Sequence, residues 1–340
     1  MTFDDGLLDD EVALGRADVR LRYLAESGAR VRREAGAAAE GVSEAVQRLS
    51  DSPSRAVVAA GPDSRLLRAV LEPVCPVPFV AWPGSGLPGW VGSLDLVVVL
   101  APEGRDPATA RAVAEAVRRG CQLVVAAPAG SLVAEHAQGR YVTLLPTQTG
   151  DQLAVAVVVL DLLDRLHLGP QTDPDVVADA LDEVALACSP HKDIAINPAK
   201  ILAIGIADSD PVIWGGTVLA ARAGRRIAES IRRATGRTAL AADAEHLLPV
   251  LEAAAPVDVF ADPFSDDGDQ RRPALVVLDD GSQDDAVRQT RAQLEESATR
   301  QGVRIEEIGS EAEGDVARYA AMLLAGTYAA AYLQVGQAQR

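Results

Sequence analysis

Short apolar runs alternate with amphipathic segments along the chain from residue 55 to residue 167. The runs have the length of strands, and apolar residues recur at helical spacing in the segments between them. The run Leu96-Val97-Val98-Val99-Leu100 is apolar at every position, as expected of a central parallel strand that helices cover on both faces. The alternation predicts a doubly wound parallel sheet, with strands at 56–60, 77–81, 95–100, 122–126 and 141–145 and helices at 64–72, 107–119, 130–137 and 150–167.

The same alternation returns in the second half of the chain. It predicts strands at 211–214, 237–241, 257–261, 274–279 and 303–308, and helices at 198–207, 217–234, 243–254, 284–300 and 314–335. The pair Gly169-Pro170 ends the last helix of the first unit, because proline cannot continue a helix. The sequence therefore predicts an α/β protein in three parts: N-terminal helices at 1–50 and two domains at 51–170 and 190–340, each a parallel sheet flanked by helices.

Length and charge narrow the class of protein. The 340 residues contain 49 acidic and 32 basic side chains, a formal net charge of −17, which disfavours binding to nucleic acid or to an anionic membrane surface. The N-terminus is acidic where a signal peptide is basic, and no uninterrupted apolar stretch approaches the roughly 18 residues of a membrane span. We expect a cytoplasmic protein with neither a nucleic acid nor a membrane as partner.

The residues that usually hold metals and cofactors are few and scattered. Three cysteines, Cys75, Cys121 and Cys188, have no paired spacing, which favours buried reduced thiols over disulfides or zinc ligands. The four histidines form no metal motif, and the chain has neither a P-loop nor a GxGxxG sequence. The acidic stretch 265–269 lacks the ligand spacing of a calcium loop and is expected to be a solvated loop. We expect no metal and no cofactor.

Three turns that follow predicted strands are candidates for a ligand site: residues 61–64, 102–106 and 215–217. Ligands of open parallel sheets collect at the carboxyl ends of the strands, where turns expose N–H groups and helix N-termini. Each turn is equally well explained as an ordinary connection to a helix, capped by Ser64, Asp106 or Thr217. The candidate ligand-contacting residues are Ser64, Gly104, Arg105, Gly215, Gly216 and Thr217.

Several motifs occur in a characteristic order along the chain. They are Leu87-Pro88-Gly89-Trp90-Val91-Gly92, the run at 95–100, Pro128-Ala129-Gly130-Ser131-Leu132, Asn197-Pro198-Ala199-Lys200 and Pro211-Val212-Ile213-Trp214-Gly215-Gly216. The series resembles the bifunctional phosphoglucose/phosphomannose isomerases, which are two-domain sugar isomerase (SIS) proteins, over most of residues 55–335. The resemblance implies two SIS-like domains, a homodimer, and isomerisation of glucose 6-phosphate or mannose 6-phosphate to fructose 6-phosphate.

The resemblance also implies a catalytic pair. The family keeps a glutamate on the helix after the second glycine turn and a histidine a few helical turns further on, and Glu229 and His246 lie near those positions. Such an isomerase moves a proton between C2 and C1 through an enediol, which a carboxylate can carry while an imidazole assists ring opening. The alternative interpretation is a surface glutamate on one helix and a histidine at the start of the next.

The chain departs from the family at the loop that receives the sugar phosphate. Where the family has Ser-Tyr-Ser-Gly-Asn-Thr, residues 101–106 keep only Gly104. Glu103 and Asp106 bring negative charge to this loop, which Arg105 partly offsets. The first glycine-rich turn keeps only Ser64, an expected arginine aligns with Gln152, and the tail 334–340 lacks the family's late lysine. The alternative function is therefore a non-catalytic protein that binds a sugar phosphate or another carbohydrate derivative.

Overall fold

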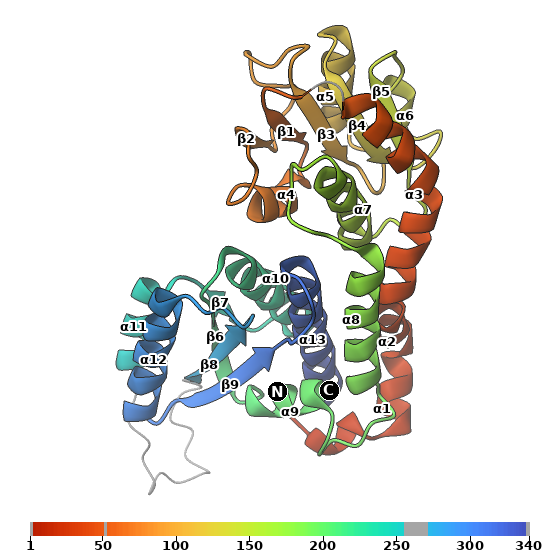
Figure 1. Ribbon diagram of the computed structural model, residues 1–340. Helices are drawn as coiled ribbons and strands as arrows, with labels where there is room; N and C mark the ends of the chain where they lie inside the picture. The colour runs from red at the N-terminus through yellow and green to blue at the C-terminus, as the bar shows by residue number, and fades with distance from the viewer. Residues whose placement is uncertain (1–2, 51–52, 255–270, 338–340) are drawn as a thin grey trace, which may run out of the picture. The chain divides into compact units, whose positions relative to one another are not determined.

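The computed structural model describes residues 3–50, 53–254 and 271–337 and consists of two compact α/β units. The first-sheet unit is residues 27–179, and the second-sheet unit combines residues 1–26 with residues 180–340. Each unit contains one parallel sheet with helices on both faces, so the predicted fold class is confirmed (Figure 1). The two units divide the N-terminal segment 1–50 between them.

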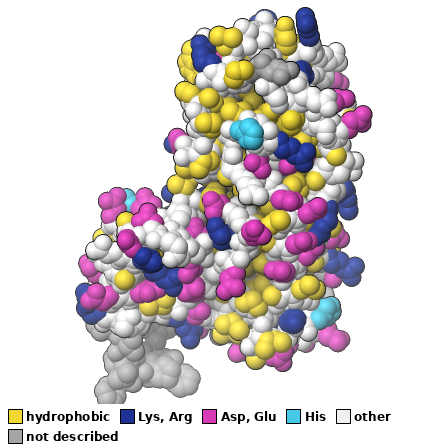
Figure 2. All heavy atoms as spheres, viewed as in Figure 1, with side chains coloured by type: hydrophobic (Ala, Val, Ile, Leu, Met, Phe, Trp, Pro, Cys, Tyr) yellow, Lys and Arg dark blue, Asp and Glu magenta, His cyan; other side chains and the backbone are white. Residues whose placement is uncertain are grey.

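Charged side chains are spread over both units. On the face drawn in Figure 2, Asp and Glu side chains occur on each unit among Lys and Arg side chains. In the parts of the chain that the structure describes, no helix combines the length and the apolar character needed to cross a membrane. The closing helix α13 (Asp315–Gly336) is instead packed in the second-sheet unit, where Tyr328 and Tyr332 are fully buried.

The first-sheet unit is built on five parallel strands in the order β2-β1-β3-β4-β5. The strands are β1 (Val57–Ala60), β2 (Phe79–Trp82), β3 (Leu96–Leu100), β4 (Gln122–Ala127) and β5 (Val142–Pro146). Helices α5 (Pro107–Arg118) and α6 (Leu132–His136) cover one face. The other face is covered by α3 (Ser27–Leu49), α4 (Ser64–Leu71) and α7 (Gln152–Arg165). These elements lie within a few residues of the predicted ones.

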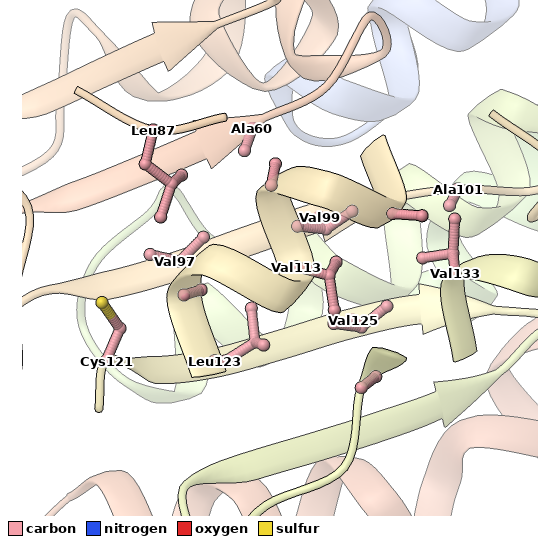
Figure 3. Packing of buried hydrophobic residues seen from close by; sticks show 14 of the residues in the cluster. Ala60, Leu87, Val97, Val99, Ala101, Val113, Cys121, Leu123, Val125 and Val133 are labelled. Carbon is pink, nitrogen blue, oxygen red and sulfur yellow. The ribbon is translucent and has the colours of Figure 1, made fainter. Parts of the chain in front are cut away.

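The core of this unit explains why β3 is apolar at every position. Val97 and Val99 point toward α5 and contact the buried cluster that contains Val113, as Figure 3 shows. Val98 is on the opposite side of the strand and is also almost fully buried, at 1% exposure. Successive residues of a strand face opposite sides of the sheet, so a strand with helices on both faces has no position left for a polar side chain.

The second-sheet unit has four parallel strands in the order β7-β6-β8-β9. They are β6 (Ser209–Gly215), β7 (Leu240–Ala241), β8 (Arg272–Asp279) and β9 (Arg304–Gly309). Helices α11 (Ala244–Glu252) and α12 (Asp285–Arg300) cover one face, and α10 (Val218–Thr235) with α13 covers the other, beside α9 (Pro198–Gly205) (Figure 1). The N-terminal elements η1 (Asp5–Leu8), α1 (Glu11–Arg16) and α2 (Asp18–Ala25) belong to this unit, and η1 and α2 pack on α13. The predicted strand at 257–261 and the acidic loop at 265–269 lie outside the described residues.

The segment between the two predicted domains is helical. Helix α8 (Pro174–Ala187) occupies most of residues 170–190, and the border between the two units falls within it. Asp173 begins the helix: its side chain accepts a hydrogen bond from the Asp175 N–H, and its carbonyl accepts one from the Val177 N–H. A capping aspartate followed by proline is a recognised helix start, so the sequence carried a signal for α8 that the preceding Gly-Pro break obscured.

The three thiols are expected to resist modification in the folded protein. Cys121 and Cys188 are each 1% exposed, and burial raises the pKa of all three thiols, that of Cys188 to about 12. Only the thiolate reacts rapidly, so Ellman's reagent at pH 8 should modify less than one thiol per chain within minutes, and all three after denaturation. Rapid reaction of two or three thiols in the native protein would show that the packing around Cys121 and Cys188 is wrong.

Candidate functional site

Each sheet contains a point where the strand order reverses, between β1 and β3 in one and between β6 and β8 in the other. The connections that leave two such strands run in opposite directions and leave a crevice at their carboxyl ends. The structure has a cavity of about 290 Å³ at the first point and one of about 400 Å³ at the second. We call them the first and the second switch-point cavities.

The first switch-point cavity brings two of the predicted turns together. Pro62 and Asp63 from the first turn line it with Glu103, Gly104 and Arg105 from the second. The sequence placed these turns at the carboxyl ends of two strands, and the pairing of β1 with β3 makes them neighbours. Residues of two turns that the sequence predicts as ligand candidates therefore line one cavity.

A carboxylate already occupies the helix N-terminus at this cavity. Asp106 caps α5: its side chain accepts hydrogen bonds from the Thr109 hydroxyl at 2.6 Å, the Thr109 N–H at 2.9 Å and the Ala108 N–H at 3.3 Å. The bond from the Thr109 hydroxyl, reinforced by the two amides, lowers the pKa of Asp106 below its ordinary value. The ionised side chain thus holds the donors that a bound phosphate would use.

The other charges at this cavity also disfavour a phosphate. Glu103 is exposed, and the Asp63 carboxylate accepts a hydrogen bond from the Gln152 amide at 2.6 Å. Arg105 is the single basic side chain lining the cavity, and it makes no ion pair with any described residue. Three carboxylates, of Asp63, Glu103 and Asp106, therefore face one guanidinium.

Gly104 and Ser64 have local reasons to be where they are. Gly104 has φ +65°, and a Cβ there would overlap Ser131 and lie 3.0 Å from Pro128 Cδ. Its carbonyl accepts a hydrogen bond from the Val133 N–H, so Gly104 joins the turn to the start of α6. Ser64, the first residue of α4, is 1% exposed, and its hydroxyl has no hydrogen-bond partner among the residues described. Packing against Ser131 and Pro128 thus requires glycine at position 104. The Ser64 hydroxyl, in contrast, is a buried hydrogen-bond donor with no acceptor among the described residues.

The third predicted turn connects β6 to α10 beside the second switch-point cavity. A Cβ on Gly215 would overlap the backbone of Ala220, and one on Gly216 would overlap Val287. Thr217 caps α10 by accepting from the Ala220 N–H at 3.1 Å, while its hydroxyl donates to the Asp280 carboxylate. Both hydrogen-bonding functions of Thr217 are therefore occupied within the fold.

Glu229 and His246 lie apart on the two sides of the second sheet. Glu229 is on α10, where its Oε2 pairs with Arg226 at 2.5 Å and with Arg233 at 3.8 Å. His246 is on α11, over the opposite face, with its side chain 68% exposed and 3.3 Å from Glu245. Neither residue lines a switch-point cavity. Within one chain, the structure therefore does not bring the predicted pair together.

The second half of the chain matches a known family. Residues 195–337 fit the family described as "Bacterial phospho-glucose isomerase C-terminal SIS domain". This segment contains the whole second sheet. Residues 195–337 are thus similar to a SIS domain. The resemblance to the SIS-domain phosphosugar isomerases that the sequence predicts is thereby confirmed.

Solved structures extend the SIS fold to the whole chain. Tagatose-6-phosphate ketose/aldose isomerase from Escherichia coli superimposes with a TM-score of 0.64 at 13% identity, covering 93% of this chain and 91% of that one. The C-terminal domain of glucosamine-fructose-6-phosphate aminotransferase from Francisella tularensis gives 0.56 at 12% identity, covering 92% and 94%. At these identities the likeness establishes the fold, a tandem of two SIS-like domains. No protein in a search of curated sequences matches the chain.

Three residues of the second SIS-like domain were missed by the sequence analysis. Asp279 and Asp280 end β8 at the second switch-point cavity, and Arg291 of α12 also lines it. Arg291 pairs with Asp279 at 2.6 Å, with Glu295 at 2.7 Å and with Glu307 at 2.5 Å. The sequence Asp279-Asp280-Gly281 could have indicated this site, because it is a polar, glycine-containing turn at the end of a predicted strand, like the three candidate turns. The pairing with Arg291 depends on the fold and left no sequence pattern.

Within the described ranges, no cluster of three or more His, Cys, Asp or Glu side chains could hold a metal ion. Lys200, one of two lysines in the chain, is fully buried. Its ammonium donates to Asp9 at 2.6 Å and to the carbonyls of Lys192 at 2.8 Å and Pro190 at 3.0 Å. These three hydrogen bonds use all three ammonium protons and connect α9 to the end of η1 and to the loop before α9. Lys200 is therefore a structural residue.

Removing the Asp106 cap tests the geometry of the first cavity. In Asp106→Ala the free energy of unfolding should fall by about 1 kcal/mol at pH 7, because the α5 donors lose their acceptor. Since the folded-state pKa is lowered, the ionised carboxylate stabilises the fold above the ordinary aspartate pKa, and this stabilisation is lost as the pH falls through the lowered value. In thermal unfolding, the difference between wild type and Asp106→Ala should therefore shrink as the pH falls through the lowered pKa of Asp106.

The matched control is Asp106→Asn, which keeps the capping oxygen but not the charge, so at pH 7 it should lose less stability than Asp106→Ala, and its difference from wild type should vanish at low pH. An Asp106→Ala deficit of the same size at pH 3 and pH 7 would contradict a role for the ionised carboxylate.

Proposed function

We propose that the protein is a phosphosugar aldose-ketose isomerase that interconverts glucose 6-phosphate or mannose 6-phosphate with fructose 6-phosphate. The observation that carries the proposal is the position of Glu229: it lies on the helix after the Gly215-Gly216-Thr217 turn, inside the segment that matches the SIS family. The tagatose-6-phosphate ketose/aldose isomerase of similar fold adds weight to this class of reaction. Proton transfer through an enediol needs no cofactor.

In this proposal Glu229 removes the proton at C2 of the aldose and returns it at C1 of the ketose. Arg226 and Arg233 both pair with Oε2, and the Glu229 side chain is 35% exposed, so a substrate can reach the carboxylate. The arginines orient the carboxylate. They also place positive charge beside the enediolate that forms in the transition state, which is the charge an isomerase has to stabilise.

His246 is proposed to open the sugar ring in the site of a second copy of the chain. Its exposed imidazole lies across the sheet from Glu229, so a complete pair needs two chains. In a homodimer, random mixing of inactive Glu229→Gln and His246→Ala chains should restore roughly a quarter of the sites. Sedimentation at micromolar concentration should show a dimer; a monomer, or no recovery in mixed dimers, would exclude a shared site.

A second candidate is a non-catalytic protein that binds a carbohydrate derivative. Asp106 on the α5 amides favours it, because this carboxylate excludes a phosphate from the family's usual place. Replacing Glu103 with serine should tighten sugar-phosphate binding, and more strongly at low salt, if the ligand still enters the first switch-point cavity. Titration calorimetry at two salt concentrations measures this. An unchanged affinity would place the phosphate elsewhere.

A coupled assay with the purified chain separates the two candidates. Glucose 6-phosphate, mannose 6-phosphate and fructose 6-phosphate are each supplied, and formation of the isomer is followed together with the shift in melting temperature. Conversion of any of the three supports the isomerase. A raised melting temperature without conversion supports the binding protein. Neither effect with any of the three contradicts the isomerase and excludes these three sugar phosphates as ligands of a binding protein.

A further inference from the structure

A groove outside the switch-point cavities carries no role in the proposed reaction. It lies in the second-sheet unit at the end of β9 and encloses about 600 Å³ between α8, α9 and α13. It is larger than either switch-point cavity. The residues that line it lie at 180–202, 307–313 and 321–325, all in the unit that contains the second sheet.

The floor of the groove is apolar and made of small side chains. Ala180, Val184 and Ala187 lie along one face of α8, and Ala321 and Ala325 lie one turn apart on α13. Positions three and four apart on a helix share a face, so α8 and α13 each present a row of small residues to the groove. Small residues let another helix approach closely and pack its larger side chains between the two walls.

The rim of the groove is acidic. Glu183 on α8 and Glu311 and Glu313 in the loop before α13 line it, and none of the three forms an ion pair within the described part of the chain. Glu307, the fourth carboxylate, pairs with Arg291. The lining residues include no lysine, arginine or histidine. Figure 2 shows acidic side chains bordering apolar ones over the region where Figure 1 places α8 and α13.

A cation close to this rim, Arg318, is already paired with a carboxylate. Arg318 of α13 reaches the Ala312 carbonyl at 3.4 Å, but its guanidinium pairs with Asp315 at 2.5 Å. Three carboxylates around an apolar floor thus remain without a counter-charge, and exposed like charges repel one another. A ligand with an apolar face and basic flanks would cover the floor and neutralise the rim together.

We propose that this groove docks a basic amphipathic helix of a partner protein. Large apolar residues at i, i+3/i+4 and i+7 of that helix fill the space above the alanines, and Lys or Arg residues beside them pair with Glu183, Glu311 and Glu313. Complementary charge gives the contact its orientation and its salt dependence. The proposal does not depend on the isomerase reaction.

A selection experiment with random peptides tests whether the groove prefers such a helix. A displayed library of peptides of about 15 residues, long enough for four helical turns, is selected on the wild-type chain and counter-selected on Ala325→Trp. Ala325 is half-buried on α13, so the indole fills the groove at a site that tolerates a larger side chain. Enriched peptides should carry Lys or Arg beside a helical apolar stripe.

The charges are tested on the selected peptides. The triple variant Glu183→Gln/Glu311→Gln/Glu313→Gln should weaken binding roughly 3- to 100-fold at low salt, as expected for three exposed ion pairs. The control triple Glu40→Gln/Glu44→Gln/Glu135→Gln changes the net charge equally on exposed positions of the other unit and should leave binding unchanged. Circular dichroism confirms that each variant is folded.

Three results would overturn the proposal. No enrichment against Ala325→Trp, or enriched peptides without net positive charge, would show that the groove does not select such a helix. Equal weakening of peptide binding by the two triple variants would show that the net charge of the protein, and not the rim of the groove, attracts the peptides. A dimer that becomes a monomer in Ala325→Trp would assign the groove to a second copy of the chain.

Discussion

Glu229→Gln is expected to lower turnover of the sugar phosphates by roughly 10²- to 10⁴-fold, the usual contribution of a general base, while leaving their binding nearly unchanged. Glutamine has the shape of glutamate and can keep a hydrogen bond to Arg226, but it cannot accept the C2 proton. The measurement is kcat and KM in the coupled assay, with affinity from calorimetry. A fall in kcat at constant affinity is what loss of the base predicts.

The matched control for this prediction is Glu296→Gln. Glu296 also pairs with an arginine of its own helix, Arg300 at 3.1 Å, and lies on the outer surface of α12. Its replacement removes a similar ion pair and should leave kcat unchanged. Turnover retained in Glu229→Gln, or lost equally in Glu296→Gln, would contradict the role assigned to Glu229.

Gly215→Ala is expected to destabilise the second SIS-like domain by about 3 kcal/mol, at the upper end of the cost of overpacking. A Cβ at this position lies 2.6 Å from the Ala221 nitrogen and closer still to the Ala220 carbonyl carbon. These are backbone atoms of the first turn of α10, so no side-chain rotation can relieve the overlap. The helix that carries Glu229 must shift away from β6.

Gly36→Ala is the control for that prediction. Gly36 lies within α3, and a Cβ there meets nothing within 4 Å. Alanine should raise the free energy of unfolding by about 0.5–1 kcal/mol, because glycine is a poor helix former. Urea unfolding of both variants gives the comparison. Equal and small effects would show that β6 and α10 are not as close as the structure has them.

The alternation of apolar runs and amphipathic segments was enough to predict both sheets, because buried parallel strands have an unmistakable composition. It was less informative where local bonds compete with strand pairing. The strand predicted at 237–241 is reduced to Leu240–Ala241, since Gly236 ends α10 in a left-handed conformation and Arg237 donates to the carbonyls of Ala207 and Ser209. Helix α8 was missed because a Gly-Pro break resembles a linker.

The sequence was enough to predict which turns form the candidate site, but not which charged and polar side chains pair with one another there. Chain order and parallel pairing were enough to place residues 61–64 and 102–106 at the same edge of the sheet. No sequence pattern showed that Thr217 donates to Asp280, or that Arg291 pairs with Asp279 and Glu307, since these partners lie on other elements of the second-sheet unit. The position of His246 relative to Glu229 was likewise invisible, because it depends on which face of the sheet each helix covers.

Isomerisation in D₂O tests the proposed reaction most directly. Mannose 6-phosphate, glucose 6-phosphate or fructose 6-phosphate is incubated with the purified protein, and the C1 and C2 proton signals are followed by NMR. An enediol mechanism with Glu229 as the base predicts the isomer together with deuterium at C2 of the aldose or C1 of the ketose, and neither in Glu229→Gln. Unchanged proton signals with all three sugars, under conditions where calorimetry shows them bound, would contradict the isomerase.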